Sequence, residues 1–241
     1  MDALELIKKY SEETSRIESR ISLLGEIPIR VIRAWEEGGL FSISWKNGRI
    51  ERLWLNVIGH NVTVAVLANR LALRLKMAGI SEVTEAALVH DWFKRRESEM
   101  VIKAKEEGRD PREANRAGEV MSGELLIGIG FSSEIILLTK STGDIGLEKM
   151  MEGDATIAEQ LIFYADSCVD NTRITTYKER FDALLPYFQP GGRYDHVDRK
   201  FLAQYGKTHR EVWDSVVLPI QNRLAELADF HEDPNNLPIT I

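Results

Sequence analysis

Apolar residues recur at every third or fourth position through most of this 241-residue chain. That spacing places them on one face of an α-helix, whereas the residues that share one face of a strand alternate every second position. The clearest stretch runs from Ile50 to Lys76 and is followed by Gly79, a typical helix stop. Its repeating positions are Leu53, Val57, His60, Val64, Leu67, Leu71 and Leu75. The pattern predicts an all-α fold.

The same spacing, with Gly and Pro residues at the segment ends, predicts helices along the rest of the chain. The helix that carries His90 and Asp91 is expected over residues 82–93, with a continuation to about 107. Asp154 is expected to cap a helix that reaches Asp166. The other expected helices cover residues 4–24, 111–128, 133–140, 176–186, 195–205 and 208–230.

Residues 26–49 show the weakest helical pattern in the chain. Residues 41–44 alternate between apolar and polar side chains, and the Asn47-Gly48 pair suits a two-residue hairpin turn. We therefore expect a small β-hairpin near residues 41–50.

The clearest break in the chain is the Pro- and Gly-containing segment 189–192. We expect an N-terminal helix and hairpin segment over residues 1–49, a helical domain over 50–188 and a C-terminal helical extension over 193–241. The histidines of the extension lie among charged residues and are expected at the surface. They are His196, His209 and His231.

The composition limits the class of partner. The formal net charge of −7 argues against a broad nucleic-acid surface, because neutralising phosphates requires a basic face. Cys168 is the single cysteine, so an internal disulfide is excluded and a reducing compartment is favoured. The chain has no signal-like amino terminus and no run near the roughly 18 apolar residues that a membrane helix needs. We expect a cytoplasmic protein without a membrane partner.

Four side chains with metal-binding donors lie within apolar segments that we expect to be helical. They are His60, His90, Asp91 and Asp166. A buried carboxylate requires a positive partner, and a metal ion shared with neutral imidazoles supplies one. Two histidines and two carboxylates suit one divalent cation of Mn, Fe, Co, Ni or Zn, with positions left for water and substrate oxygens.

The order of these residues resembles the metal-dependent phosphohydrolases of the HD-domain superfamily. Such proteins carry a single histidine, then an adjacent His-Asp pair, then a distant Asp, as His60, His90-Asp91 and Asp166 do here over residues 50–185. The resemblance implies an HD-type helical bundle and a hydrolase that attacks a nucleotide or other small phosphate ester with a metal-bound water. Trp92-Phe93 replaces the Ile-Gly that often follows the pair. No histidine lies between residues 91 and 195, which favours a single metal.

The resemblance also assigns roles to charged residues near the ligands. Many members continue the pair as His-Asp-x-x-Lys, which makes Lys94 a candidate to bind substrate and offset phosphoryl charge. Lys94 would share one helix face with His90 and Asp91 if their helix continues. Asp91 or Asp166 is a candidate proton acceptor.

Further charged residues leave alternatives open. Arg173 would share a face with Asp166 if that helix continues, and a phosphate contact and a structural salt bridge are equally favoured for it. Arg95 and Arg96 are expected on a solvated face. Glu97 and Glu119 could act as general bases, but their spacing selects neither.

Two other readings of the sequence remain. One is a non-catalytic sensor that binds a metal and a nucleotide without turnover, and the other is a helical scaffold without a metal. Metal content separates the scaffold from the first two hypotheses, and turnover separates the enzyme from the sensor. A homo-oligomer is left open.

Overall fold

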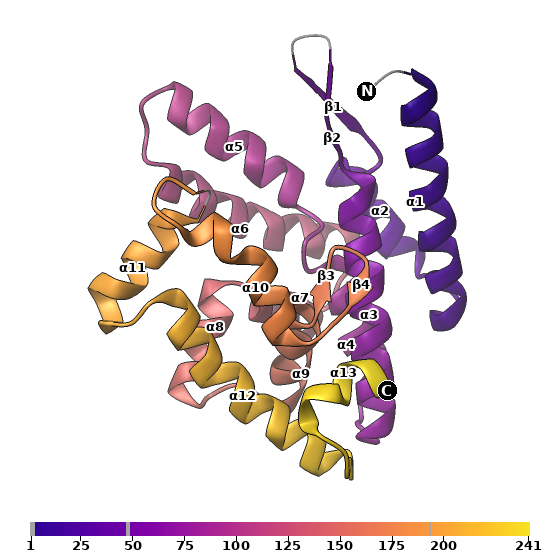
Figure 1. Ribbon diagram of the computed structural model, residues 1–241. Coiled ribbons are helices and arrows are strands. Elements are labelled where there is room, and N and C mark those ends of the chain that lie inside the picture. Colours follow the sequence, from indigo (N-terminus) through magenta and orange to yellow (C-terminus); the bar gives the residue numbers. More distant parts are fainter. Residues whose placement is uncertain (1–2, 47–48, 193) are drawn as a thin grey trace. The chain divides into compact units, whose positions relative to one another are not determined.

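The computed structural model describes residues 3–46, 49–192 and 194–241, and these are mostly helical (Figure 1). The all-α prediction is therefore confirmed. The chain forms two compact units: residues 1–66 with 81–139 make unit 1, and residues 67–80 with 140–241 make unit 2. The boundaries expected after residues 49 and 188 differ from this division and stay a prediction.

Unit 1 contains three of the four predicted ligands, namely His60, His90 and Asp91. Within it, α5 and α6 lie side by side as a helical hairpin (Figure 1). Helix α3 begins in unit 1 and runs on into unit 2. The elements are α1 (Ala3–Leu24), α2 (Ile29–Glu37), β1 (Ile43–Lys46), β2 (Arg49–Leu53), α3 (Leu55–Arg74), α4 (Ile80–Val89), α5 (Lys94–Glu106), α6 (Pro111–Ile129) and α7 (Ser133–Thr139).

The expected hairpin is present, and β1 and β2 pair antiparallel with Ile43 opposite Leu53. The turn residues Asn47 and Gly48 lie outside the described residues. The helix expected from Ile50 was wrong over its first residues, because the chain up to Leu53 pairs with β1 and α3 starts only at Leu55.

Helix α2 lies in a region where the sequence predicted little helix. It buries Val31, Ala34 and Trp35, which have helical spacing but occupy only two turns. A pattern this short carries a weak signal, since helices are usually longer than ten residues. The prediction that residues 26–49 are mainly non-helical was therefore wrong over Ile29–Glu37.

Unit 2 differs from the prediction around α9. Thr156, not Asp154, caps α9 through a capping box with Glu159, and α8 precedes it in a stretch for which the sequence predicted no element. The elements are η1 (Lys140–Thr142), α8 (Asp144–Glu152), α9 (Ile157–Ser167), β3 (Val169–Asp170), β4 (Arg173–Ile174), α10 (Tyr177–Phe188), α11 (Asp195–Tyr205), α12 (His209–Leu227), η2 (Pro234–Asn236) and α13 (Leu237–Thr240).

The histidines of the C-terminal segment separate into different environments. His209 is only 5% exposed, which contradicts the expected surface position, because it packs against the rings of Phe188 and Phe201 with centroids 4.8 Å away. His231 is exposed, as expected. The side chain of His196 lies outside the described residues.

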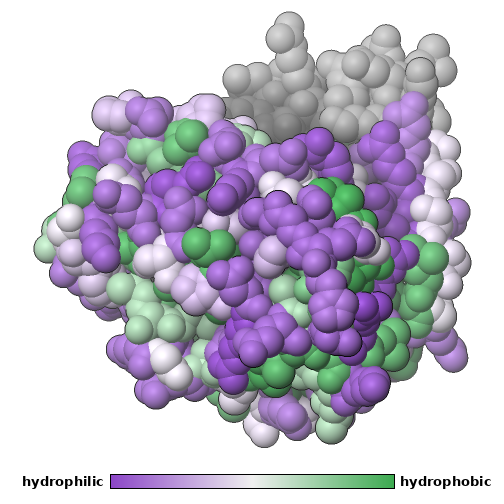
Figure 2. Space-filling model, turned by 60° about the horizontal axis from the view of Figure 1, so that its bottom comes forward, coloured by the Kyte–Doolittle hydropathy of each residue, from purple (hydrophilic) through white to green (hydrophobic). Residues whose placement is uncertain are grey.

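The molecular face in Figure 2 is mainly hydrophilic, with hydrophobic residues in separate groups. Among the described residues, no helix combines the length and the apolar character that crossing a membrane requires.

Candidate metal centre

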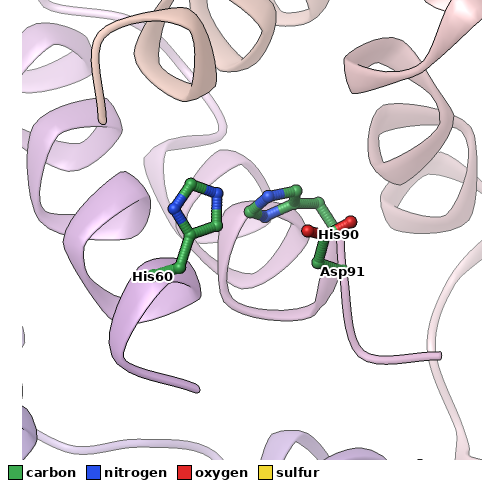
Figure 3. A group of neighbouring side chains, drawn as sticks. All are labelled: His60, His90 and Asp91. Carbon is green, nitrogen blue, oxygen red and sulfur yellow. The ribbon is translucent and has the colours of Figure 1, made fainter. Parts of the chain in front are cut away.

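His60, His90 and Asp91 converge within unit 1. His60 projects from α3 and is 9% exposed, while His90 and Asp91 are half-buried in the turn between α4 and α5. One ligand atom from each residue lies within 4.8 Å of the others. Figure 3 shows the His60 ring beside that of His90, and the two rings meet edge-on with centroids 5.3 Å apart. Three of the four predicted ligands therefore come together.

The protonation of His90 follows from its neighbour. Its Nδ1 lies 2.8 Å from the carbonyl oxygen of Ala87. A carbonyl oxygen only accepts hydrogen bonds, so Nδ1 carries the hydrogen and donates it. In the neutral ring Nε2 then holds the lone pair that a metal needs, and the backbone contact also orients the ring.

The end of α4 determines where His90 and Asp91 point. The helix expected to reach residue 93 was wrong over its last residues, since α4 stops at Val89, and its last carbonyl groups accept hydrogen bonds from other donors. The Leu88 oxygen accepts hydrogen bonds from Nε1 of Trp35 at 2.8 Å and from Nδ2 of Asn61 at 3.2 Å. The Val89 oxygen accepts from the backbone N–H of Trp92 at 3.2 Å. These bonds satisfy carbonyl groups that a helix end leaves open.

The donor set fits a divalent cation. Zinc-like ions form bonds of about 2.0–2.2 Å to imidazole nitrogen and carboxylate oxygen, so two ligands of one ion lie no more than about 4.4 Å apart. The ligand atoms of His60, His90 and Asp91 lie within 4.8 Å of one another, which is close to the separation that binding to one ion requires. Three protein ligands of this chemistry also leave coordination positions for oxygen ligands.

The predicted fourth ligand belongs to the other unit. Asp166 lies near the end of α9 in unit 2 and is half-buried, so its role as a ligand stays a prediction. Arg173 was expected on the same helix face as Asp166, and this is wrong because α9 ends at Ser167. Arg173 is exposed on β4, where its backbone pairs with Asp170.

Lys94 lies beside the candidate ligands, although not for the expected reason. It is the first residue of α5 and does not share a helix with His90 and Asp91. Its Nζ is nonetheless 3.4 Å from Oδ1 of Asp91, and its side chain is 40% exposed. The turn between the helices, rather than helical spacing, brings the ammonium to the carboxylate.

The next two cations connect α5 to the end of α2. Arg95 donates to the carbonyl oxygen of Gly39 at 3.2 Å and to the Ser42 hydroxyl, so its expected solvated position was wrong. Arg96 is 41% exposed and lies 3.4 Å from a carboxylate oxygen of Glu37. Arg95 therefore contacts the segment that follows α2, and Arg96 contacts the last residue of α2.

Glu97 lies half-buried on α5, one turn after Lys94. Burial raises the pKa of its carboxyl group, Lys94 lowers it, and Asp91 and Glu119 raise it further. Its side chain fits against α6 at Gly118, where an added Cβ would lie 3.2 Å from Cγ of Glu97. The balance of these effects is a pKa of Glu97 above its ordinary value, with burial as the largest cause.

Comparisons of the chain with protein-family models, with curated proteins and with solved structures find no match. The function of the site therefore has to be argued from its own residues. Sequence reasoning missed Trp35 and did not select a role for Asn61. Both residues contact Leu88, but Trp35 lies 53 positions and Asn61 lies 27 positions before it in the sequence, and such long-range contacts leave no local pattern.

Proposed function

We propose that this protein is a metal-dependent phosphohydrolase of the HD type, acting on a nucleotide or another small phosphate ester. The observation that carries the proposal is the convergence of His60, His90 and Asp91, with His90 held in the tautomer that a metal ligand needs. Asp166 is the proposed fourth ligand, by the resemblance in sequence order.

When bound, one divalent cation of Mn, Fe, Co, Ni or Zn would polarise a phosphoryl oxygen and acidify a water molecule. Asp91 and Asp166 would balance its two charges, so the ion and its carboxylates would together be neutral. A phosphomonoester brings about −1.5 to −2 charges. Lys94, with its ammonium 3.4 Å from Asp91, would supply the positive charge that orients such a substrate. We also propose that Asp91 or Asp166 accepts the proton released by water.

A screen for phosphate release tests this proposal. The purified protein is supplied with each candidate metal and incubated with nucleoside monophosphates and with other small phosphomonoesters. We expect release with at least one metal and substrate, and loss of both metal and activity in His90→Ala.

A matched histidine variant serves as the control. His231→Ala changes an exposed residue whose ring lies 3.3 Å from Asp229, and it should retain metal and activity. Nucleotide binding without phosphate release would contradict the enzyme and favour the sensor. Absence of metal under all loading conditions would contradict both.

A further inference from the structure

Two side chains from different helices converge on one backbone oxygen directly before the candidate ligands. Trp35 of α2 and Asn61 of α3 both donate to the Leu88 carbonyl, two residues before His90. Trp35 is 3% exposed, and Asn61 and Leu88 are 0–1% exposed. Because water has little access to this oxygen, loss of both donors would leave a buried carbonyl group with an unmet hydrogen-bonding requirement.

Continued helix is the alternative that these donors oppose. If α4 continued, the Leu88 oxygen would accept from the backbone N–H of residue 92, as an α-helix requires. His90 and Asp91 would then be adjacent helical residues whose side chains diverge by about 100°. In the observed turn, the two side chains and His60 instead bring their ligand atoms within 4.8 Å of one another.

We propose that Trp35 and Asn61 are positioning residues for the metal centre: by occupying the Leu88 carbonyl they end α4 and hold His90 and Asp91 toward His60. Neither residue is among the predicted ligands. Their action is on the backbone that carries two ligands, so it concerns metal affinity and coordination geometry. This inference rests on the metal centre of the proposed function, but not on phosphate hydrolysis.

Titration with Co²⁺ tests the inference without a substrate, because visible absorption reports both affinity and geometry. Trp35→Phe keeps an aromatic ring and removes the N–H donor, while Asn61→Leu removes the other donor and keeps the branched skeleton of the side chain. Partners that orient metal ligands typically change affinity by about 10–100-fold when removed. We expect each variant to bind Co²⁺ at least about tenfold more weakly and with an altered absorption band.

Trp213→Phe is the matched control. Trp213 lies in α12 of unit 2, against Phe163 and His209, so the same substitution there should reduce stability and leave Co²⁺ affinity unchanged. Thermal melts of the metal-free proteins establish that each variant is folded. If Trp35→Phe does not fold, Asn61→Leu decides the question.

Unchanged Co²⁺ affinity in folded Asn61→Leu would overturn the positioning role, even if its melting temperature falls. A wild-type protein that binds neither Co²⁺ nor any of the other candidate metals would overturn this inference together with the proposed function. Wild-type protein that binds Co²⁺ and releases no phosphate with any metal would overturn only the proposed function. Weaker binding in both donor variants, with the control unchanged, supports the inference.

Discussion

A Cβ atom added to Gly38 would lie 2.0 Å from the carbonyl oxygen of Trp92. The residue that ends α2 therefore lies directly against the turn that carries His90 and Asp91. This contact has no room for a side chain, and the φ angle of −69° at Gly38 shows that backbone conformation alone does not require glycine. The close approach of the Trp92 carbonyl group therefore explains why position 38 is a glycine.

Gly38→Ala should push the ligand turn away from α2. Because the added methyl group would meet backbone atoms rather than a flexible side chain, we expect a stability loss of about 1–3 kcal/mol. Metal affinity should fall as well, since the displaced turn carries two candidate ligands. Urea denaturation and Co²⁺ titration measure the two effects. Gly128→Ala, a helical position with open space around the added Cβ, should instead gain about 0.5–1 kcal/mol.

Lys94→Ala should leave the metal in place and reduce the rate or the substrate affinity. The lost contact is charge-assisted and worth about 1.5–3 kcal/mol, or roughly ten- to a hundredfold. Arg96→Ala should change little, because Arg96 is directed to Glu37. Kinetics of both variants, after metal content is verified, provide the comparison. Equal losses would indicate a diffuse basic rim, and an unaffected Lys94→Ala would refute the substrate role.

Glu97→Gln should stabilise the protein relative to wild type as pH rises. The pKa of Glu97 is raised above 4.5 in the folded state, mainly by burial. Between the unfolded and folded pKa values the folded protein binds the extra proton, so wild-type stability falls as pH increases through this window and then levels off. Glutamine removes that loss. Urea denaturation at several pH values between about 4 and 8 should show the difference growing with pH. A constant difference would contradict this expectation.

Asp166→Asn should reduce metal content if Asp166 completes the metal site. Elemental analysis of the wild-type protein should give about one transition metal per chain, because the four residues form one ligand set. Asp170→Asn is the control, since Asp170 lies 3.7 Å from Arg180 in an ordinary ion pair. Two tightly held ions in the wild type would contradict the single site. Full metal content in Asp166→Asn would exclude Asp166 as a required ligand.

The helical class and much of the element order could be predicted from the sequence, because both depend on local information. Helix α1 ends before Gly25, which has a positive φ angle of 82°, as its role as a helix stop requires. The β1–β2 hairpin occurs where side chains alternate. Short elements such as α2 were missed because two turns contain too few repeats to distinguish a helix from a loop.

By itself the sequence determined that His60, His90, Asp91 and Asp166 occur in order among apolar segments. Only the tertiary structure decided that His60 meets His90 and Asp91. Helical periodicity contains no information about a hydrogen bond from Trp35, 53 residues before Leu88, or about contact between Gly38 and Trp92. In our proposal, the hydrogen bonds from Trp35 and Asn61 replace the one that the Leu88 oxygen would accept from residue 92 in a longer helix, and α4 ends there. The direction in which the His90 and Asp91 side chains point follows from where α4 ends.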